Sequence, residues 1–464
     1  MRKLLALVCL PLIMALLLAP VSLHAQSSPG AMVSVIVQTA GDAGAAASAA
    51  QALGARVTHR WSIIDGFAAT MPAGSARELA LRPDVLHVTE DSRLMATGRT
   101  STGGSTGGGA VDTSALVSSY PYATRAVDAW NSGLTGNGIG VAIVDSGVQH
   151  SSSAAAQDLG SRVVQDISFN SAALYQADRY GHGTHVAGIA AGNGTASGGK
   201  YIGMAPKANI FNVKFSADDG SGTESDLISA LDWVYQNQGR GIRVVNLSIT
   251  SSLAQSYKVS PVAAAVERLW TSGMVVVVAA GNRGASSDAV QYPPANDPYV
   301  ITVGAIDDQG TTALTDDVLA SWSSRGVTQD GFAKPEIVAP GAHIVSLKAC
   351  DSCGLNASTA NNVDSGYFRM GGTSMAAPMV SGAVALMLEK NPGLTPNQVK
   401  WILMNTGQTY TGMPKGGPKA LDANAAANYS GTPSSANSGL TPSGGGSSGT
   451  GTGSNVHWMV SIDY

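Results

Sequence analysis

The first part of the chain alternates short apolar runs with polar positions in a regular order. Segments with strand or helix periodicity follow one another as strand 33–40, helix 43–53, strand 56–64, strand 66–71, helix 75–81 and strand 85–89. The order β-α-β-β-α-β is typical of a small ferredoxin-like unit. We therefore predict an α+β domain over residues 26–97.

A second pattern begins near residue 119 and continues to about residue 429. Apolar runs alternate with helical stretches, which indicates parallel βαβ units. Residues 138–144 and 274–280 are apolar at nearly every position, as expected of strands that are buried on both faces of a parallel sheet. We predict an α/β domain with a mainly parallel central sheet over 119–429.

Serine, threonine and glycine dominate the segments that flank this domain. Residues 98–118 have the composition of a linker, and residues 430–464 that of a tail ending in a short apolar-polar segment too small to fold alone. Residues 1–25 carry Arg2 and Lys3, then an apolar run, then a small residue, which predicts a secretory signal peptide. A membrane anchor is the alternative, but the run is shorter than the roughly 20 residues that span a bilayer.

Composition narrows the class of protein. The net charge of −4, from 27 basic and 31 acidic residues, gives no reason to expect a nucleic-acid partner. Hydrophobic residues make up 44% and charged residues 12%, so a large core can form, while 56 glycines exclude a helical bundle. After export, Cys350 and Cys353 remain, and we favour a local disulfide over free thiols. Zinc is disfavoured because no second cysteine pair exists.

Four residues stand where strands or helices begin or end. Asp145 follows the run 138–144, at the carboxyl end of a predicted parallel strand, where ligand crevices open. His182 lies between two glycines. His185 leads into an apolar helix face, and we predict that it is a packed structural residue. The pair lacks the Glu of a His-Glu-x-x-His zinc site. Asn282 follows the run 274–280.

Ser374 opens a strongly apolar helix, with Pro378 expected in its first turn. Taken singly, these residues could be a turn Asp, a turn Asn and an N-cap Ser. Together they form the set that acyl transfer needs. A serine nucleophile requires an imidazole base, a carboxylate that orients the imidazole, and a donor for the oxyanion.

The motifs around these residues resemble those of the subtilisin-like serine proteases, the subtilases. They are Asp-Ser-Gly at 145–147, Gly-His-Gly-Thr-His-Val-Ala-Gly at 181–188, Ala-Ala-Gly-Asn at 279–282 and Gly-Thr-Ser-Met-Ala-Ala-Pro at 372–378. Their order Asp, His, Asn, Ser is that of the family. The resemblance spans about 119–429, and residues 33–95 are similar to the family's inhibitor-type propeptide.

The resemblance implies a three-layer subtilisin-like fold and a role for each site residue. Asp145 would orient His182, the general base and then acid. Ser374 would be the nucleophile, and Asn282 an oxyanion donor. Substrate would bind as an added β-strand. The segments implied to bind it contain Ser248, Ile249, Thr250, Ala279, Ala280 and Gly281.

Two positions depart from the usual family pattern. Thr250 stands where many relatives have glycine, and Gln291 falls near the expected floor of the main specificity pocket, often a small residue. We predict a narrowed pocket.

Residues 192–199 lack the carboxylates of the family's calcium loop, so a structural calcium is implied only by the resemblance, with ligands unknown. The chemistry requires no cofactor.

The resemblance further implies a monomeric, secreted zymogen that acts on proteins or peptides and has no membrane anchor. Its own propeptide would inhibit it until cut between about Met95 and Thr100. A non-catalytic binding protein is the first alternative, which the complete set of four residues disfavours. A second keeps the chemistry but changes the acceptor, as in peptide ligation or ester hydrolysis. A sedolisin-like acid peptidase is disfavoured because that family uses Glu where His182 stands.

Overall fold

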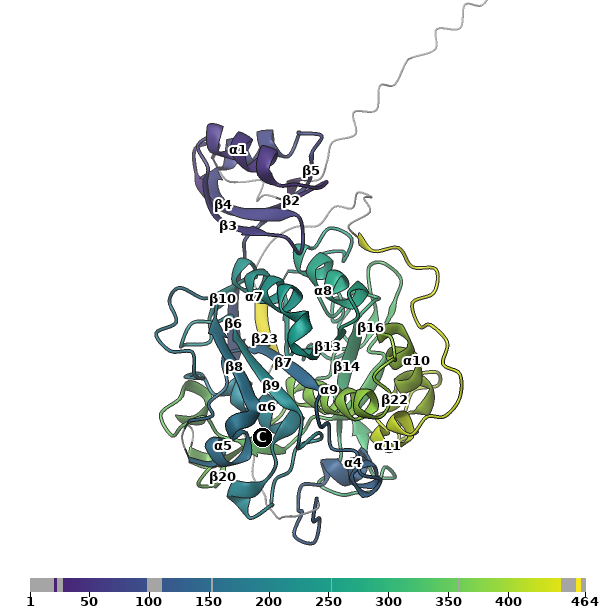
Figure 1. The fold of residues 1–464 in the computed structure, drawn as a ribbon. Helices are drawn as coiled ribbons and strands as arrows, with labels where there is room; N and C mark the ends of the chain where they lie inside the picture. The colour runs from purple at the N-terminus through teal and green to yellow at the C-terminus, as the bar shows by residue number, and fades with distance from the viewer. Residues whose placement is uncertain are drawn as a thin grey trace, which may run out of the picture.

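The computed structural model describes residues 21–22, 28–97, 111–443 other than 152, 252 and 358, and 456–459. A small N-terminal domain lies on a larger α/β domain (Figure 1). The predicted signal peptide lies outside the described residues except for β1 (Val21–Ser22), which pairs with β5 (Val85–Glu90). Residues 98–110 of the predicted linker and most of the tail after residue 443 also lie outside them.

The small domain has the predicted β-α-β-β-α-β order. Its sheet runs β5-β2-β4-β3, and each of these neighbouring pairs is antiparallel, which confirms the ferredoxin-like topology. Its other elements are β2 (Met32–Thr39), α1 (Gly44–Ala52), β3 (Arg56–Trp61), β4 (Gly66–Pro72) and α2 (Ala73–Leu79). The strand predicted to reach residue 64 ends at Trp61, because the chain turns there and Asp65 has a positive φ of 45°.

The large domain is built on a mainly parallel sheet, as predicted. Its order is β22-β18-β14-β13-β11-β7-β9-β8, and each adjacent pair is parallel. A short β15 (Val318–Leu319) pairs antiparallel with β14. The parallel strands are β7 (Gly140–Asp145), β8 (Val163–Ser168), β9 (Asn209–Lys214), β11 (Ile242–Leu247), β13 (Val275–Ala279), β14 (Ile301–Asp307), β18 (Ile337–Pro340) and β22 (Lys419–Ala420).

Helices cover both faces of this sheet (Figure 1). On one face α6 (His182–Ala191) packs against α9 (Thr373–Lys390), and on the other α7 (Glu224–Gln236) packs against α8 (Pro261–Thr271). The remaining helices are α3 (Tyr120–Ala123), α4 (Ala126–Asn131), α5 (Ser153–Asp158), α10 (Pro396–Thr406) and α11 (Ala423–Ala427). The minor strands are β16 (Gly326–Val327), β17 (Ala333–Lys334), β19 (Ile344–Leu347), β20 (Asn362–Asp364) and β21 (Tyr367–Met370).

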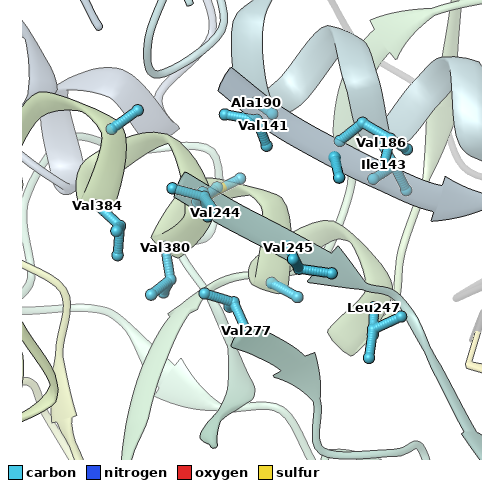
Figure 2. Close-up of a cluster of buried hydrophobic side chains, with 14 of the residues drawn as sticks. Val141, Ile143, Val186, Ala190, Val244, Val245, Leu247, Val277, Val380 and Val384 are labelled. Carbon is cyan, nitrogen blue, oxygen red and sulfur yellow. The ribbon is translucent and has the colours of Figure 1, made fainter. Parts of the chain in front are cut away.

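Branched aliphatic side chains fill the space between the sheet and the α6–α9 layer (Figure 2). Ile143 of β7, Val244 of β11 and Val277 of β13 are fully buried, as are Val186 of α6 and Val380 of α9. Such side chains suit the central strands of a parallel sheet, which are apolar on both faces. In the described part of the chain no helix is both long and apolar enough to cross a membrane.

The small domain docks on α7. The indole Nε1 of Trp61 donates to Ser229 Oγ at 2.8 Å. Asp232 Oδ1 accepts hydrogen bonds from the backbone N–H groups of Ser62 and Ile63 at 3.2 and 2.8 Å. The β3–β4 turn of the small domain is therefore fixed to helix α7 of the large domain by a buried carboxylate.

The two domains and the C-terminal segment share a four-stranded sheet. Its order is β10-β6-β23-β12, built from β10 (Gly222–Thr223), β6 (Arg93–Thr97), β23 (Val456–Met459) and β12 (Ile249–Ser251). β6 continues from the small domain, and β23 is the yellow strand within the teal domain in Figure 1. A segment near the end of the chain therefore lies against β12, the strand predicted to bind substrate.

Candidate active site

Asp145 ends β7 and is fully buried. Its Oδ1 accepts hydrogen bonds from His182 Nδ1 at 2.8 Å and from the backbone N–H of Ser146 at 2.7 Å. Burial raises the pKa of Asp145, and the adjacent His182 opposes that rise. The sequence predicted this pair, and the sheet brings it together at the carboxyl end of a central strand.

Two glycines let α6 begin directly beside Asp145. A Cβ on Gly183 would lie 2.2 Å from the Gly147 carbonyl oxygen and 2.9 Å from Asp145 Oδ1, so only glycine fits there. Gly181 has a φ of 101°, and a Cβ on it would lie 2.5 Å from the side-chain oxygen of Asn356. His182 is therefore placed by backbone positions that exclude side chains.

Asp178 is a residue of this site that the sequence analysis missed. Its fully buried carboxylate accepts five hydrogen bonds of 2.7 to 3.0 Å. The donors are Ser146 Oγ, the N–H groups of Tyr180 and Gly181, and both the N–H and the Oγ1 of Thr184. Asp178 thus connects the residue after Asp145 to both sides of His182. The only signal was an acidic residue just before the histidine motif, which a solvated loop would also produce.

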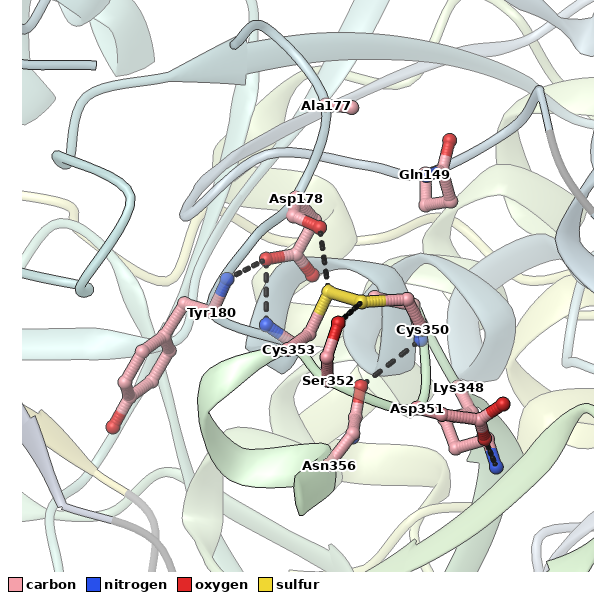
Figure 3. The surroundings of a disulfide bond; sticks show 12 residues. Gln149, Ala177, Asp178, Tyr180, Lys348, Cys350, Asp351, Ser352, Cys353 and Asn356 are labelled. Carbon is pink, nitrogen blue, oxygen red and sulfur yellow. Dashed lines mark hydrogen bonds and ion pairs between the residues drawn. A yellow bond between two sulfur atoms is a disulfide. The ribbon is translucent and has the colours of Figure 1, made fainter. Parts of the chain in front are cut away.

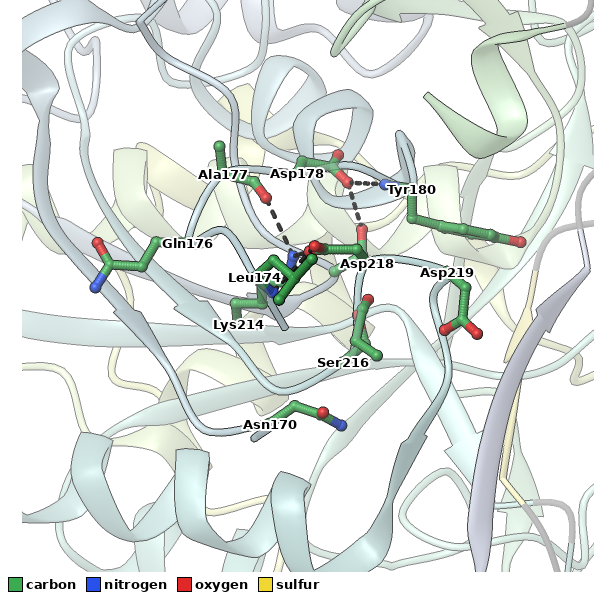
Figure 4. Close-up of polar contacts among 12 residues, drawn as sticks. Asn170, Leu174, Gln176, Ala177, Asp178, Tyr180, Lys214, Ser216, Asp218 and Asp219 are labelled. Carbon is green, nitrogen blue, oxygen red and sulfur yellow. Dashed lines mark hydrogen bonds and ion pairs between the residues drawn. The ribbon is translucent and has the colours of Figure 1, made fainter. Parts of the chain in front are cut away.

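The loop that carries Asp178 is anchored from beneath by Lys214, the last residue of β9 (Figure 4). Its Nζ donates to the Ala177 carbonyl at 3.1 Å and pairs with Asp218 at 2.7 Å. Asp218 in turn accepts from the backbone N–H of Leu174 at 3.1 Å. The buried Lys214 therefore holds the middle of this loop, directly at Ala177 and through Asp218 at Leu174.

Cys350 and Cys353 are joined by a disulfide beside the same loop (Figure 3). Cys353 Sγ lies 3.5 Å from the Asp178 carbonyl oxygen. The next backbone N–H groups, those of Gly354 and Leu355, donate to the carbonyls of residues 179 and 180 at 3.1 and 2.8 Å. The disulfide turn consequently supports the segment that leads into α6.

Ser374 lies in the first turn of α9 and is fully buried. Its Oγ donates to the Ser248 carbonyl at 3.0 Å, and its own carbonyl accepts from Ser248 Oγ at 2.9 Å. Pro378 lies in the second turn of α9, not in the first as predicted. A proline there cannot donate to the carbonyl four residues earlier, that of Ser374, so the Ser248 hydroxyl supplies the missing donor.

Asn282 is held near Ser374 by hydrogen bonds from the adjacent residue, Thr373. Its Oδ1 accepts from the N–H and the Oγ1 of Thr373, each at 3.1 Å, and Thr373 Oγ1 also accepts from the Gly281 N–H at 3.1 Å. These bonds fix the amide, and Nδ2 is buried with no hydrogen-bond partner among the described residues. An amide N–H held in this way can donate to a negatively charged oxygen that forms near Ser374.

His185 is a packed residue, as predicted. Its Nε2 donates to the Phe368 carbonyl at 3.0 Å, and burial lowers its pKa to about 3, so it stays neutral.

The residues implied to bind substrate are spread over three segments. Ser248 precedes β12, which contains Ile249 and Thr250, while Ala279 ends β13 ahead of Ala280 and Gly281. The side chain of Gln291 forms hydrogen bonds with the backbone of residues 327 and 329. Its Nε2 donates to the Val327 carbonyl at 3.1 Å, and its Oε1 accepts from the Gln329 N–H at 2.6 Å. Its place in the pocket floor stays a prediction.

Aspartates elsewhere in the chain could also bind calcium, but in its described part no group of three or more His, Cys, Asp or Glu is placed to hold a metal ion. Asp218 is paired with Lys214, and Asp226 caps the start of α7. Asp317 is buried beside other acidic groups, and burial raises its pKa to about 7.

Comparison with known proteins gives a consistent result. The model of the subtilase family, Peptidase_S8, matches residues 136–432. The chain is 39% identical over 299 residues to serine protease AprX of Bacillus subtilis (strain 168), covering 63% of this chain and 66% of that protein. It is 31% identical over 364 residues to subtilisin E of the same organism, covering 77% and 79%.

A solved structure with the same fold is fervidolysin from Fervidobacterium pennivorans, a keratinolytic enzyme related to subtilisin. The TM-score is 0.67 at 23% identity, over 88% of this chain and 63% of fervidolysin. The chain thus spans just under two thirds of the length of AprX and of fervidolysin.

Asp178→Asn tests whether the missed carboxylate organises the site. The amide would face N–H donors that now bond to a carboxylate, so we expect a loss of at least about 3 kcal/mol in the free energy of unfolding. Denaturant unfolding of both forms on a Ser374→Ala background, which prevents self-digestion, measures this. The control is Asp316→Asn, at an exposed aspartate, for which we expect less than about 0.5 kcal/mol. Equal effects would contradict the assignment.

Proposed function

This chain belongs to the subtilase family, and we propose that it is a secreted serine endopeptidase made as a zymogen. The observation that carries the proposal is the buried hydrogen bond of 2.8 Å between His182 Nδ1 and Asp145 Oδ1. It holds one imidazole nitrogen as a donor, which leaves the other, Nε2, as the base. The relatives that match over most of this domain bear the names of serine proteases.

In the proposed reaction, Ser374 Oγ attacks the carbonyl carbon of the scissile bond while His182 Nε2 takes its proton. The hydroxyl donates to the Ser248 carbonyl in the structure, so it must rotate before transfer. The imidazolium that forms is stabilised by Asp145 and then protonates the leaving amine. Water, activated by the same imidazole, hydrolyses the acyl-enzyme.

Negative charge on the substrate oxygen would be stabilised by Asn282 Nδ2 and the backbone N–H of Ser374. Support comes from the Asn282 amide, whose oxygen is held by Thr373 and whose Nδ2 has no partner among the described residues. Fixed donors are effective because they need no reorganisation when charge develops.

Substrate is proposed to add as a strand to β12, which carries Thr250. Main-chain hydrogen bonds would supply affinity, and pockets for alternate side chains would supply specificity. β12 already pairs antiparallel with β23, with Thr250 opposite His457, which supports its ability to accept an added strand. Thr250 and Gln291 would narrow the pocket for the residue before the scissile bond.

The zymogen proposal rests on contacts of the small domain. Asp91 accepts from the N–H and Oγ of Ser225 at 3.0 and 2.7 Å, at the first turn of α7. Its chain continues into β6, which pairs with β10, and the proposed cut lies between Met95 and Thr100. A small domain held at both places would block substrate access to the active site until the chain is cleaved. Export through the signal peptide agrees with a disulfide at 350–353.

The central test compares the wild type with Ser374→Ala. We expect the wild type to mature to a shortened form, to cleave casein and to react with a fluorophosphonate probe, because all three need the activated hydroxyl. The variant should stay at full length and inert, as judged by gel, mass spectrometry and probe fluorescence. If both mature alike, self-processing is wrong. A wild type that neither cleaves nor labels would be a non-catalytic binding protein.

Asn282→Ala tests the oxyanion donor separately. Removing one fixed donor should lower kcat by about 100- to 1000-fold and leave KM nearly unchanged, because the bond strengthens only as charge develops. Steady-state kinetics on a chromogenic peptide gives both values. Asn282→Asp removes the donor while keeping the size and should lose as much. A change confined to KM would contradict the role.

The tail strand gives a further prediction. Deleting residues 444–464 should shorten the lag before activity appears, because β23 occupies the edge of β12 that substrate needs. His457→Pro should act like the deletion, since proline has no backbone N–H to pair, whereas His457→Ala should behave as wild type. Progress curves of peptide hydrolysis after dilution measure the lag. An unchanged lag in both the deletion and the proline variant would exclude this role for the tail.

A further inference from the structure

Arg369 is a buried cation that the proposed chemistry does not use. It lies on β21 with 1% of its surface exposed, and its Nε, Nη1 and Nη2 have no hydrogen-bond partner among the described residues. A guanidinium keeps its proton in proteins, so burial cannot be relieved by neutralisation. An unpaired buried charge is strongly unfavourable, which implies a partner that the described chain does not supply.

Arg369 lines a cavity of about 360 Å³. The walls come from four other parts of the chain, namely residues 117–120, Tyr201, residues 308–310 and residues 343–345. A water molecule accounts for roughly 30 Å³ of liquid, so the cavity has room for a small polyatomic ligand together with water.

A second polar group in the same wall lacks a partner. Ser118 Oγ is buried and has no hydrogen-bond partner within the described ranges. Ser118 precedes α3 and Arg369 belongs to β21, so the two are far apart in the sequence and are brought together by the fold. Two buried donors without acceptors at one cavity point to an acceptor-rich ligand.

The acidic residue in the wall does not fill this need. Asp308 accepts from Ser119 Oγ at 2.5 Å and from the Gly310 N–H at 3.3 Å. No ion pair joins Asp308 to Arg369, although both are described, and burial raises the Asp308 pKa. The charge of Arg369 is therefore left for a ligand.

We propose that this cavity binds a small oxyanion, a carboxylate or inorganic phosphate, through the Arg369 guanidinium and the Ser118 hydroxyl. The planar fork of a guanidinium matches the two oxygens of either group. β21 leads through Gly371 and Gly372 to Ser374, so an occupied site would brace the strand that precedes the nucleophile. The proposal does not depend on the proteolytic chemistry.

The test is a thermal unfolding titration of the full chain on a Ser374→Ala background, in Tris–chloride buffer at constant ionic strength. Phosphate and acetate are added in separate series. We expect a saturable rise in Tm for the unsubstituted site, because a ligand that binds only the folded state stabilises it. Ser118→Ala should raise the anion concentration at half-saturation by about tenfold or more, as expected for the loss of one hydrogen bond to a charged acceptor.

Arg369→Met, which keeps much of the length and removes the charge, should abolish the saturable rise. Without added anion its Tm should equal or exceed that of the unsubstituted protein, because an uncompensated charge has been removed. Arg56→Met, at an exposed arginine of β3, controls for general salt effects. A Tm rise that is equal in all forms, or a large loss of Tm for Arg369→Met in chloride alone, would overturn the proposal.

Discussion

Eight central strands run in one direction, so the carboxyl ends of β7, β11 and β13 lie at the same edge of the sheet. Each end delivers a different group. Asp145 completes β7, Ser248 follows β11, and Asn282 comes shortly after β13. Helices α6 and α9 start at that edge, which adds His182 and Ser374. Reversing one strand would remove its group from the site.

The buried polar groups at this edge are held by partners from distant parts of the chain. Asp178 bonds to donors on both sides of His182, and the Ser248 hydroxyl satisfies the carbonyl that Pro378 leaves without a donor. Such bonds are worth little singly in net stability, but leaving any of these groups unpaired would cost about 1–3 kcal/mol. These bonds therefore constrain the site residues that lie in loops.

Much of this arrangement could be predicted from the sequence. Runs apolar on both faces identified buried parallel strands, and glycines beside Asp145 and His182 indicated close backbone approach. Asp178 could not be identified, because its role depends on Ser146 and Thr184 meeting it in space, and no local pattern separates it from a solvated aspartate. The prediction that Pro378 lies in the first turn of α9 was wrong. Such a prediction requires the first residue of the helix to be known to within a few residues. The pairing of residues 456–459 with β12 was equally hidden, since it joins segments about 200 residues apart.

The disulfide turn has a practical consequence for preparing the protein. Cys353 contacts the Asp178 carbonyl, and the residues after it bond to the backbone just ahead of His182. A chain synthesised in a reducing cytosol would fold with this turn as a dithiol, whereas one exported to the periplasm would close it. At this turn, batches from the two expression routes would then differ by two hydrogens, and the segment that positions the His182 imidazole would be less constrained in the dithiol form. The oxidation state of the 350–353 pair should therefore be determined for each preparation.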